Sequence, residues 1–214
     1  MNRKSRPSRP QLVCVLADNS GSMYGPKAEA ATAGIQEMPM HCQSTGPRGA
    51  DRSYFRFVLI RFGSVAEVDQ PSHMKPVREI DPDSIFIEGT GGGTNLVQAL
   101  EIACSGLTGY VRREPADHPE RAEHPLPLVL LFSDGFNNAP GNPVTAADRI
   151  KALDLDGEGI TIACAGVATQ PDDQPDEQLL RKIASPDCYV PYSGHPHAQQ
   201  FSRRSRQLRR IVAG

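Results

Sequence analysis

The sequence predicts a doubly wound α/β fold: a mostly parallel central sheet, one antiparallel edge strand, and helices on both faces. Several strand-length runs are apolar without polar alternation, which is typical of strands buried on both faces. Helical patterns separate these runs along the chain, as in α/β domains. With 214 residues, the chain is long enough to form one such domain with a substantial core.

The first half of the chain contains an apolar strand, a helix and a hairpin. The elements expected here are a strand over 12–17, a helix over 26–40, a strand over 54–62 and a short strand over 65–68. Only Gly63 and Ser64 separate the last two, so a hairpin with an antiparallel edge strand is predicted. The proline-rich residues 70–88 are expected to be irregular.

The second half alternates strands and helices more regularly. Asn95 is the predicted N-cap of a helix whose apolar stripe runs to Leu107, and the charged residues 109–125 are expected to form a surface loop. Asp176 is the predicted cap of a later helix. The other expected elements are strands over 127–132, 159–167 and 188–190 and helices over 142–153 and 197–212.

Charge and apolar content indicate the class of protein to which the chain belongs. The formal net charge is −2 and the pI is about 6.3, so no global positive field favours nucleic acid. Residues 1–10 are basic and polar and are expected to be a disordered tail, which leaves 11–214 as the domain. No segment has the length and apolarity of a signal peptide or a membrane span, so a cytoplasmic protein with reduced cysteines is expected.

Oxygen-bearing side chains follow the predicted strands where the chain turns toward a helix. Asp18, Ser20 and Ser22 follow the first strand, Thr94 precedes the helix capped by Asn95, and Asp134 follows the strand over 127–132. The carboxyl ends of parallel strands meet at one edge of a sheet, where α/β proteins bind their ligands. Carboxylate and hydroxyl oxygens suit a hard cation such as Mg²⁺.

These residues resemble the metal-ion-dependent adhesion site (MIDAS) of von Willebrand factor A domains. Asp18-Asn19-Ser20-Gly21-Ser22 matches the DxSxS signature, while Thr94 in GGGTNL and Asp134 in LLFSDG match the separate threonine and aspartate. The similarity extends over about residues 11–212. Within the family, the chain looks like the bacterial TerY-type proteins of tellurite resistance, although Ser133 stands where that group often has threonine.

The resemblance implies a protein-binding module and not an enzyme. It implies that Mg²⁺, with Mn²⁺ as an alternative, is held by Asp18, Ser20, Ser22, Thr94 and Asp134, partly through water. An acidic side chain of a protein partner would then complete the metal shell. For TerY-type proteins the implied setting is a bacterial stress-response assembly that includes a kinase and a phosphatase.

Two alternatives remain open. The first is a Mg²⁺-dependent phosphohydrolase of the haloacid-dehalogenase type with Asp18 as nucleophile, although Ser20 stands where that chemistry uses a second carboxylate as general acid. The second is an adaptor whose site works without metal. An EF-hand is excluded because Met23 occupies the position that requires glycine. The glycines at 89–93 lack the lysine of a phosphate-binding loop.

Overall fold

The computed structural model describes residues 11–45, 55–70, 73–120, 124–170 and 172–192. The expected tail over 1–10 and the expected helix over 197–212 lie outside the described residues.

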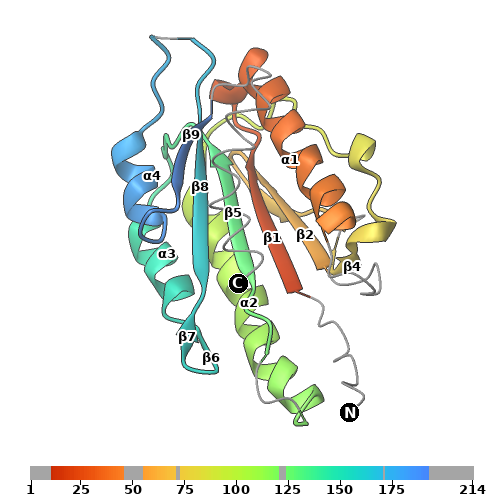
Figure 1. The fold of residues 1–214 in the computed structure, drawn as a ribbon. Helices are drawn as coiled ribbons and strands as arrows, with labels where there is room; N and C mark the ends of the chain where they lie inside the picture. The colour runs from red at the N-terminus through yellow and green to blue at the C-terminus, as the bar shows by residue number, and fades with distance from the viewer. Residues whose placement is uncertain (1–10, 46–54, 71–72, 121–123, 171, 193–214) are drawn as a thin grey trace.

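A mostly parallel sheet forms the centre of the molecule (Figure 1). Its strands lie in the order β3-β2-β1-β5-β8-β9. The pairs β1–β2, β1–β5, β5–β8 and β8–β9 are parallel, whereas β3 is antiparallel to β2 at one edge. The bounds are β1 Gln11–Asp18, β2 Phe55–Phe62, β3 Ala66–Val68, β5 Leu128–Ser133, β8 Thr161–Val167 and β9 Tyr189–Tyr192. The predicted doubly wound α/β fold is confirmed.

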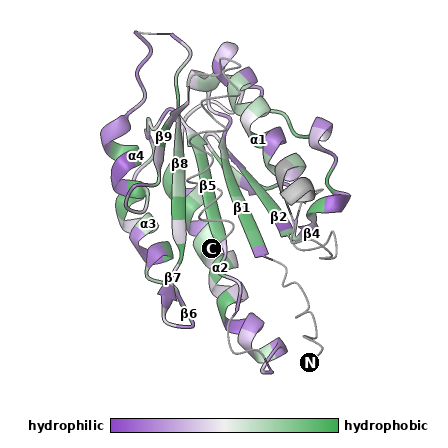
Figure 2. Ribbon diagram, in the orientation of Figure 1, coloured by the Kyte–Doolittle hydropathy of each residue, from purple (hydrophilic) through white to green (hydrophobic). Residues whose placement is uncertain are grey.

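Helices cover both faces of this sheet. Helix α1 (Pro26–Thr45) lies on one face, and α2 (Leu96–Asp117), α3 (Pro143–Lys151) and α4 (Glu177–Ile183) lie on the other (Figure 1). Side chains of β1 alternate between the two cores: Val13 and Val15 pack on the α1 face, Cys14 and Leu16 on the opposite face. The central strands are therefore hydrophobic along most of their length (Figure 2).

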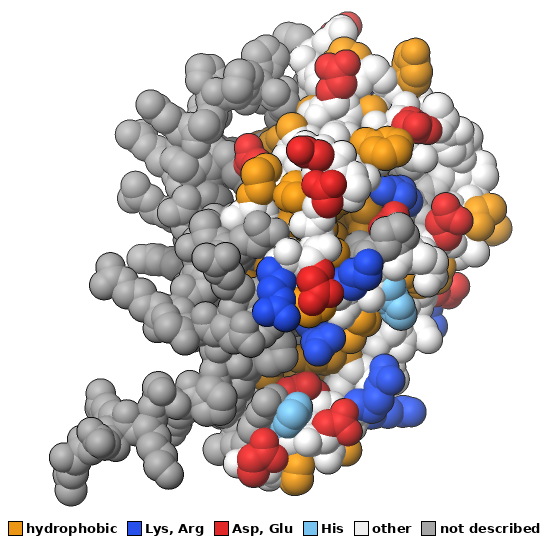
Figure 3. Space-filling model, turned by 90° about the vertical axis from the view of Figure 1, so that its right-hand side faces the viewer, with side chains coloured by type: hydrophobic (Ala, Val, Ile, Leu, Met, Phe, Trp, Pro, Cys, Tyr) orange, Lys and Arg blue, Asp and Glu red, His pale blue; other side chains and the backbone are white. Residues whose placement is uncertain are grey.

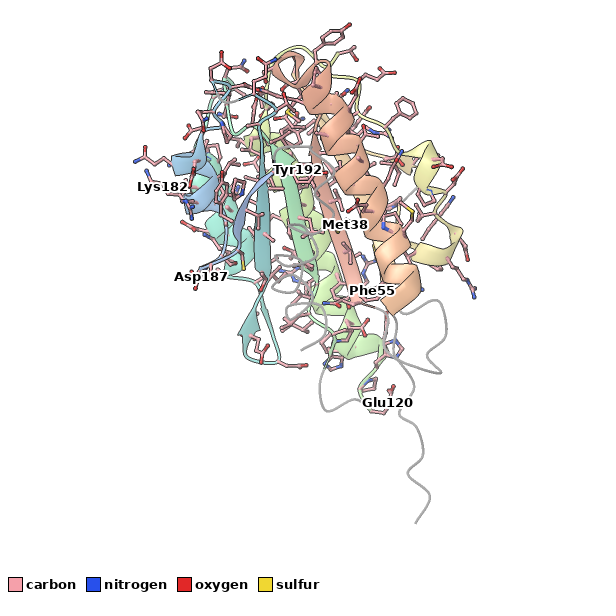
Figure 4. All side chains as sticks on the ribbon, turned by 45° about the horizontal axis from the view of Figure 1, so that its top comes forward. Met38, Phe55, Glu120, Lys182, Asp187 and Tyr192 are labelled. Atoms are coloured by element: carbon pink, nitrogen blue, oxygen red, sulfur yellow. The ribbon has the colours of Figure 1, made fainter. Side chains whose placement is uncertain are left out.

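Helix α1 approaches the sheet closely at Gly34. A Cβ atom there would lie 3.0 Å from Phe132 Cε1 and 3.1 Å from the Tyr192 hydroxyl. Tyr192 of β9 lies beside α1 in Figure 4 and meets the Phe132 ring edge-on, with centroids 6.3 Å apart. The glycine thus allows a close contact between helix and sheet.

The prediction of a surface loop over 109–125 is wrong for residues 109–117, which belong to a helix. Helix α2 continues to Asp117, because the apolar stripe that includes Leu107 extends to Tyr110, which is buried and donates from its hydroxyl to the Pro125 carbonyl at 3.0 Å. The charged side chains that suggested a loop belong to the outer side of this helix, and Pro115 lies within its last turn.

Smaller elements also differ from expectation. Residues 70–88 include the two-residue strand β4 (Lys75–Pro76), antiparallel to β2, and short 3₁₀ helices over Val77–Glu79 and Pro82–Ser84. A separate hairpin of β6 (Asp154–Leu155) and β7 (Glu158–Gly159) precedes β8, so Gly159 does not belong to the core strand. No described helix combines the length and apolarity needed to cross a membrane.

Candidate metal centre

Three loops meet at the carboxyl end of the parallel sheet, which is at the top in Figure 1. Asp18 is the last residue of β1, Asp134 follows β5, and Thr94 lies two residues before α2. The two aspartates are fully buried and Thr94 is 3% exposed. Such burial of polar groups is costly unless they are hydrogen-bonded or bind a ligand.

The first loop is organised around the Asp18 carboxylate. Its Oδ1 accepts from the Ser20 amide at 2.9 Å, and Ser20 Oγ lies 3.1 Å from Ser22 Oγ. Ser20 is fully buried, whereas Ser22 is exposed. A 3₁₀ turn, Gly21–Met23, carries Ser22 and anchors the loop by burying the Met23 side chain.

Ser133 joins the first loop to the third. Its hydroxyl donates to Asp18 Oδ2 at 2.5 Å and accepts from the Gly135 amide at 2.9 Å. Burial raises the pKa of Asp18 to about 6, with a minor contribution from the Asp134 charge, although the hydrogen bonds from Ser133 and Ser20 oppose the shift. The Ser133 hydroxyl therefore holds a site carboxylate.

The glycine loop packs directly against the loop that follows β1. The Gly21 amide donates to the Gly92 carbonyl at 2.8 Å, and a Cβ atom on Gly91 would lie only 2.8 Å from the Asn19 carbonyl oxygen. Asn19 adds a second connection, since its Oδ1 accepts from the amides of Glu88 and Gly89 at 2.9 Å. The glycines thus bring two backbones into contact, as expected from their small size.

Thr94 is positioned by an asparagine that the sequence analysis did not select. Asn138 Oδ1 accepts from the Thr94 amide at 2.8 Å, and the Asn138 amide donates to the Thr94 carbonyl at 3.2 Å. Thr90, the nearby alternative hydroxyl, is exposed and donates to Glu88 Oε2 at 3.2 Å. Of the two threonines, only Thr94 is held inside the site.

Asp134 has a partner that the sequence analysis also missed. Lys27 Nζ lies 3.0 Å from Asp134 Oδ2 and 2.8 Å from Asp173 Oδ1. The other oxygen of Asp134 accepts from the Phe136 amide at 3.3 Å. The sequence signal for Lys27 was present but weak: a lysine next to Pro26 at a predicted helix start, where a cation is disfavoured by the helix dipole.

The donor set fits a hard divalent cation. Asp18 and Asp134 supply carboxylates, Ser20, Ser22 and Thr94 supply hydroxyls, and nearly all of this set is buried at one end of the sheet. Within the described part of the chain, no three residues among His, Cys, Asp and Glu are grouped so as to hold a metal. A metal here would therefore depend on hydroxyl oxygens and water, an arrangement that suits Mg²⁺ or Mn²⁺. That these five residues bind metal stays a prediction.

Comparison with known proteins gives structural matches alone. No family model matches the sequence, and no curated protein matches it. Proximal thread matrix protein 1 from the mussel byssus, in a structure with a zinc-occupied MIDAS motif, aligns with a TM-score of 0.62 and 15% identity, over 92% of this chain and 47% of that one. The chain thus spans about half the length of that protein.

Two further structures resemble the chain. One is a von Willebrand factor type A protein from Catenulispora acidiphila, with a TM-score of 0.56 and 16% identity over 92% of this chain and 42% of that one. The other is the manganese-loaded TRAP protein of Plasmodium vivax, with a TM-score of 0.52 and 18% identity over 92% of this chain and 73% of that one. At these identities the matches concern the fold alone, and the fold of this chain is similar to that of the von Willebrand factor type A protein.

Proposed function

We propose that the protein is a metal-dependent protein-binding module. The metal ligands are Asp18, Ser20, Ser22, Thr94 and Asp134. The observation that carries the proposal is the convergence of three loops that place oxygen-bearing side chains, most of them buried, at the carboxyl end of one sheet. The fold match to proteins with zinc- or manganese-loaded structures supports it.

The ligand set leaves the metal able to accept one more anion. Hydroxyl groups are weak neutral ligands and only two carboxylates are available, so Mg²⁺ or Mn²⁺ held by these residues would keep part of its positive charge. A bound metal supplies a Lewis-acidic coordination position for a carboxylate. Asp18 and Ser133 hold one wall of the site and Asn138 holds Thr94 on another, so this chain fixes the ligands before the partner arrives.

Exposed hydrophobic side chains belong to the loops that form the site. Tyr24 follows the first loop. Val65 follows Ser64, whose hydroxyl accepts from the Gly93 amide. The backbone amide of Phe136 donates to Asp134. These side chains are 73%, 67% and 50% exposed. In Figure 3, hydrophobic and acidic side chains are interspersed over the upper part of the molecule. The surface suits a partner whose Asp or Glu is flanked by apolar residues.

The finer assignment follows the sequence motifs. We infer a cytoplasmic role in a bacterial stress-response or tellurite-resistance assembly, with an associated kinase or phosphatase as candidate partners and no membrane or nucleic-acid ligand. The support is the resemblance of the motifs around Ser20, Thr94 and Asp134 to TerY-type proteins. Direct tests are binding of the candidate kinase and phosphatase in Mg²⁺ and in EDTA.

A binding role accounts for the site better than phosphohydrolysis does. The hydroxyl of Ser20 is buried against Ser22 and cannot act as a general acid near neutral pH. Asp18, the nucleophile in that alternative, accepts hydrogen bonds on both oxygens from Ser20 and Ser133. Mg²⁺-dependent turnover of a phosphate ester that Asp18→Asn abolishes would nevertheless favour the enzyme.

The first experiment is calorimetric titration of Mg²⁺ and of Mn²⁺ into the metal-free protein. The wild type is expected to bind with saturation and to melt at a higher temperature as the metal concentration rises. Asp18→Ala and Thr94→Val should lose this binding. Thr90→Val is the matched control, because Thr90 lies in the same loop but is exposed.

The possible results distinguish the five-residue metal site from an adaptor that needs no metal. Loss of binding in Thr94→Val with retention in Thr90→Val supports the five-residue site. Equal binding by both variants contradicts the assignment of Thr94. Partner capture that survives in EDTA, and in a variant with both Asp18→Ala and Ser20→Ala, would instead favour an adaptor that needs no metal.

A further inference from the structure

Lys27 occupies an unfavourable position that its contacts explain. It is the second residue of α1, where the positive end of the helix dipole repels a cation. The residue is also only 8% exposed, and burying an ammonium group is costly unless it is paired. A lysine in this place therefore needs compensation from the neighbouring loops.

Two carboxylates provide that compensation, and one of them is a proposed metal ligand. Lys27 Nζ contacts the fully buried Asp134 at 3.0 Å and the partly exposed Asp173 at 2.8 Å. The segment with Asp173 is fastened to the same strand end a second time, because the Asp176 amide donates to the Asp134 carbonyl at 2.7 Å. The ammonium group is thus fixed beside the site and cannot swing away without breaking two ion pairs.

The charges at the site then no longer balance when a divalent metal binds. A cation of charge +2 neutralises Asp18 and Asp134, and Lys27 adds one more positive charge within contact distance of Asp134. The Asp173 side chain is 30% exposed, so water and salt screen it more effectively than they screen the buried groups. With Asp173 included, the charges of the loaded site sum to zero, but its buried part, without Asp173, carries one excess positive charge.

We infer that Lys27 is a fixed counter-cation that weakens metal binding by the free domain and strengthens it when an acidic partner is bound. The inference rests on the proposed function and adds a regulation to it. A carboxylate on the metal would cancel the excess charge, so metal and partner bind cooperatively, each raising the affinity for the other by the same factor. In the metal-free domain, Lys27 takes over part of the metal's role by neutralising Asp134.

The test is calorimetric titration of Mn²⁺ into wild type and Lys27→Met, with and without acetate as a probe for the partner's carboxylate. Lys27→Met should bind Mn²⁺ more tightly without acetate, by a factor on the order of ten. Acetate should tighten Mn²⁺ binding by wild type more than by the variant. Lys75→Met is the matched control, because Lys75 is exposed on β4, which pairs with the opposite end of β2 from the site.

A second variant should change the Mn²⁺ affinity in the opposite direction. Asp173→Asn leaves Lys27 in place and removes its outer counter-charge, so it should weaken Mn²⁺ binding several-fold. It also leaves the buried ion pair with Asp134 intact, so the variant should remain folded by circular dichroism in EDTA. The Mn²⁺ affinity of the wild type should therefore lie between those of the two variants.

The outcomes distinguish failure of the inference from failure of the proposed function. Mn²⁺ binding by wild type that is equal to or tighter than binding by Lys27→Met, or tighter binding by Asp173→Asn, overturns the role of Lys27 while leaving a metal site in place. No Mn²⁺ binding by wild type or by either variant, with or without acetate, overturns the metal site and the inference together.

Discussion

Asp18 and Asp134 occupy equivalent places in the fold but are compensated in different ways. Each stands at the carboxyl end of a central parallel strand, and each is fully buried. Asp18 is held by neutral donors, the Ser20 amide and the Ser133 hydroxyl, and burial raises its pKa to about 6. Asp134 is held by a cation, Lys27, in an ion pair at 3.0 Å.

The difference shows how the domain can tolerate two buried carboxylates without metal. Two carboxylates that lie close together repel each other when no metal is bound. Lys27 removes most of that conflict at Asp134, and the raised pKa of Asp18 shows that desolvation, rather than the Asp134 charge, is the larger cost at the other carboxylate. Neutralising Asp134 should therefore cost much more stability than neutralising Asp18.

The largest effect is expected for Asp134→Asn in EDTA. This change leaves Lys27 buried with only Asp173 as a counter-charge, and the free energy of unfolding should fall by about 2 to 3 kcal/mol. Asp18→Asn should stay within about 1 kcal/mol of wild type, because it removes a charge that burial disfavours. Urea denaturation near neutral pH measures both values.

A control isolates the ion pair from the loss of hydrogen bonds. In the double variant Lys27→Met with Asp134→Asn, no cation is left without its partner, so the double variant should be more stable than Asp134→Asn alone. Equal destabilisation by Asp18→Asn and Asp134→Asn would show that the two carboxylates are not compensated differently.

The second effect is a pH dependence that belongs to Asp18. Its folded-state pKa of about 6 lies above the ordinary value of 3.8, so the folded chain holds an extra proton between these values. Stability of the metal-free protein should therefore fall as pH rises through this range, by up to about 3 kcal/mol. Denaturation in EDTA at several pH values tests this, and Asp18→Asn should remove the slope. A wild-type slope that persists in Asp18→Asn would assign the effect to other groups.

Most of the fold could be predicted because its signals are local. Continuous apolar runs give the buried strands, and the cap residues Asn95 and Asp176 accept from the amides three residues later, as helix starts require. The extension of α2 to Asp117 was missed because charged residues on its outer side obscured an apolar stripe that continues through Tyr110. Strand order and the short pairing of β4 depend on contacts between distant segments, which a pattern along the chain does not contain.

The candidate site also combines residues that local motifs predict with residues that only distant contacts reveal. Asp18, Ser20, Ser22, Thr94 and Asp134 follow recognisable local motifs, and the structure brings them to one end of the sheet. The residues that position them are distant in sequence and have no motif. Asn138 lies 44 residues from the amide it accepts from, and Lys27 lies 107 residues from Asp134. Such partners become visible only when the loops are placed together in space.

The smallest effect concerns an ion pair far from the metal site, and stability again falls as pH rises, but over a higher pH range than for Asp18. The hydrogen bond to Asp156 raises the pKa of His124 above 6.5. Its contribution to stability is therefore complete below about pH 6.5 and is lost as pH rises through the folded-state value. Asp156→Asn removes the charge and preserves the turn, because Asn tolerates the positive φ of 58° found there. Denaturation should show a larger gap between wild type and this variant at about pH 5.5 than at about pH 8.5, and an equal gap would show that His124 gains no charge-dependent stabilisation.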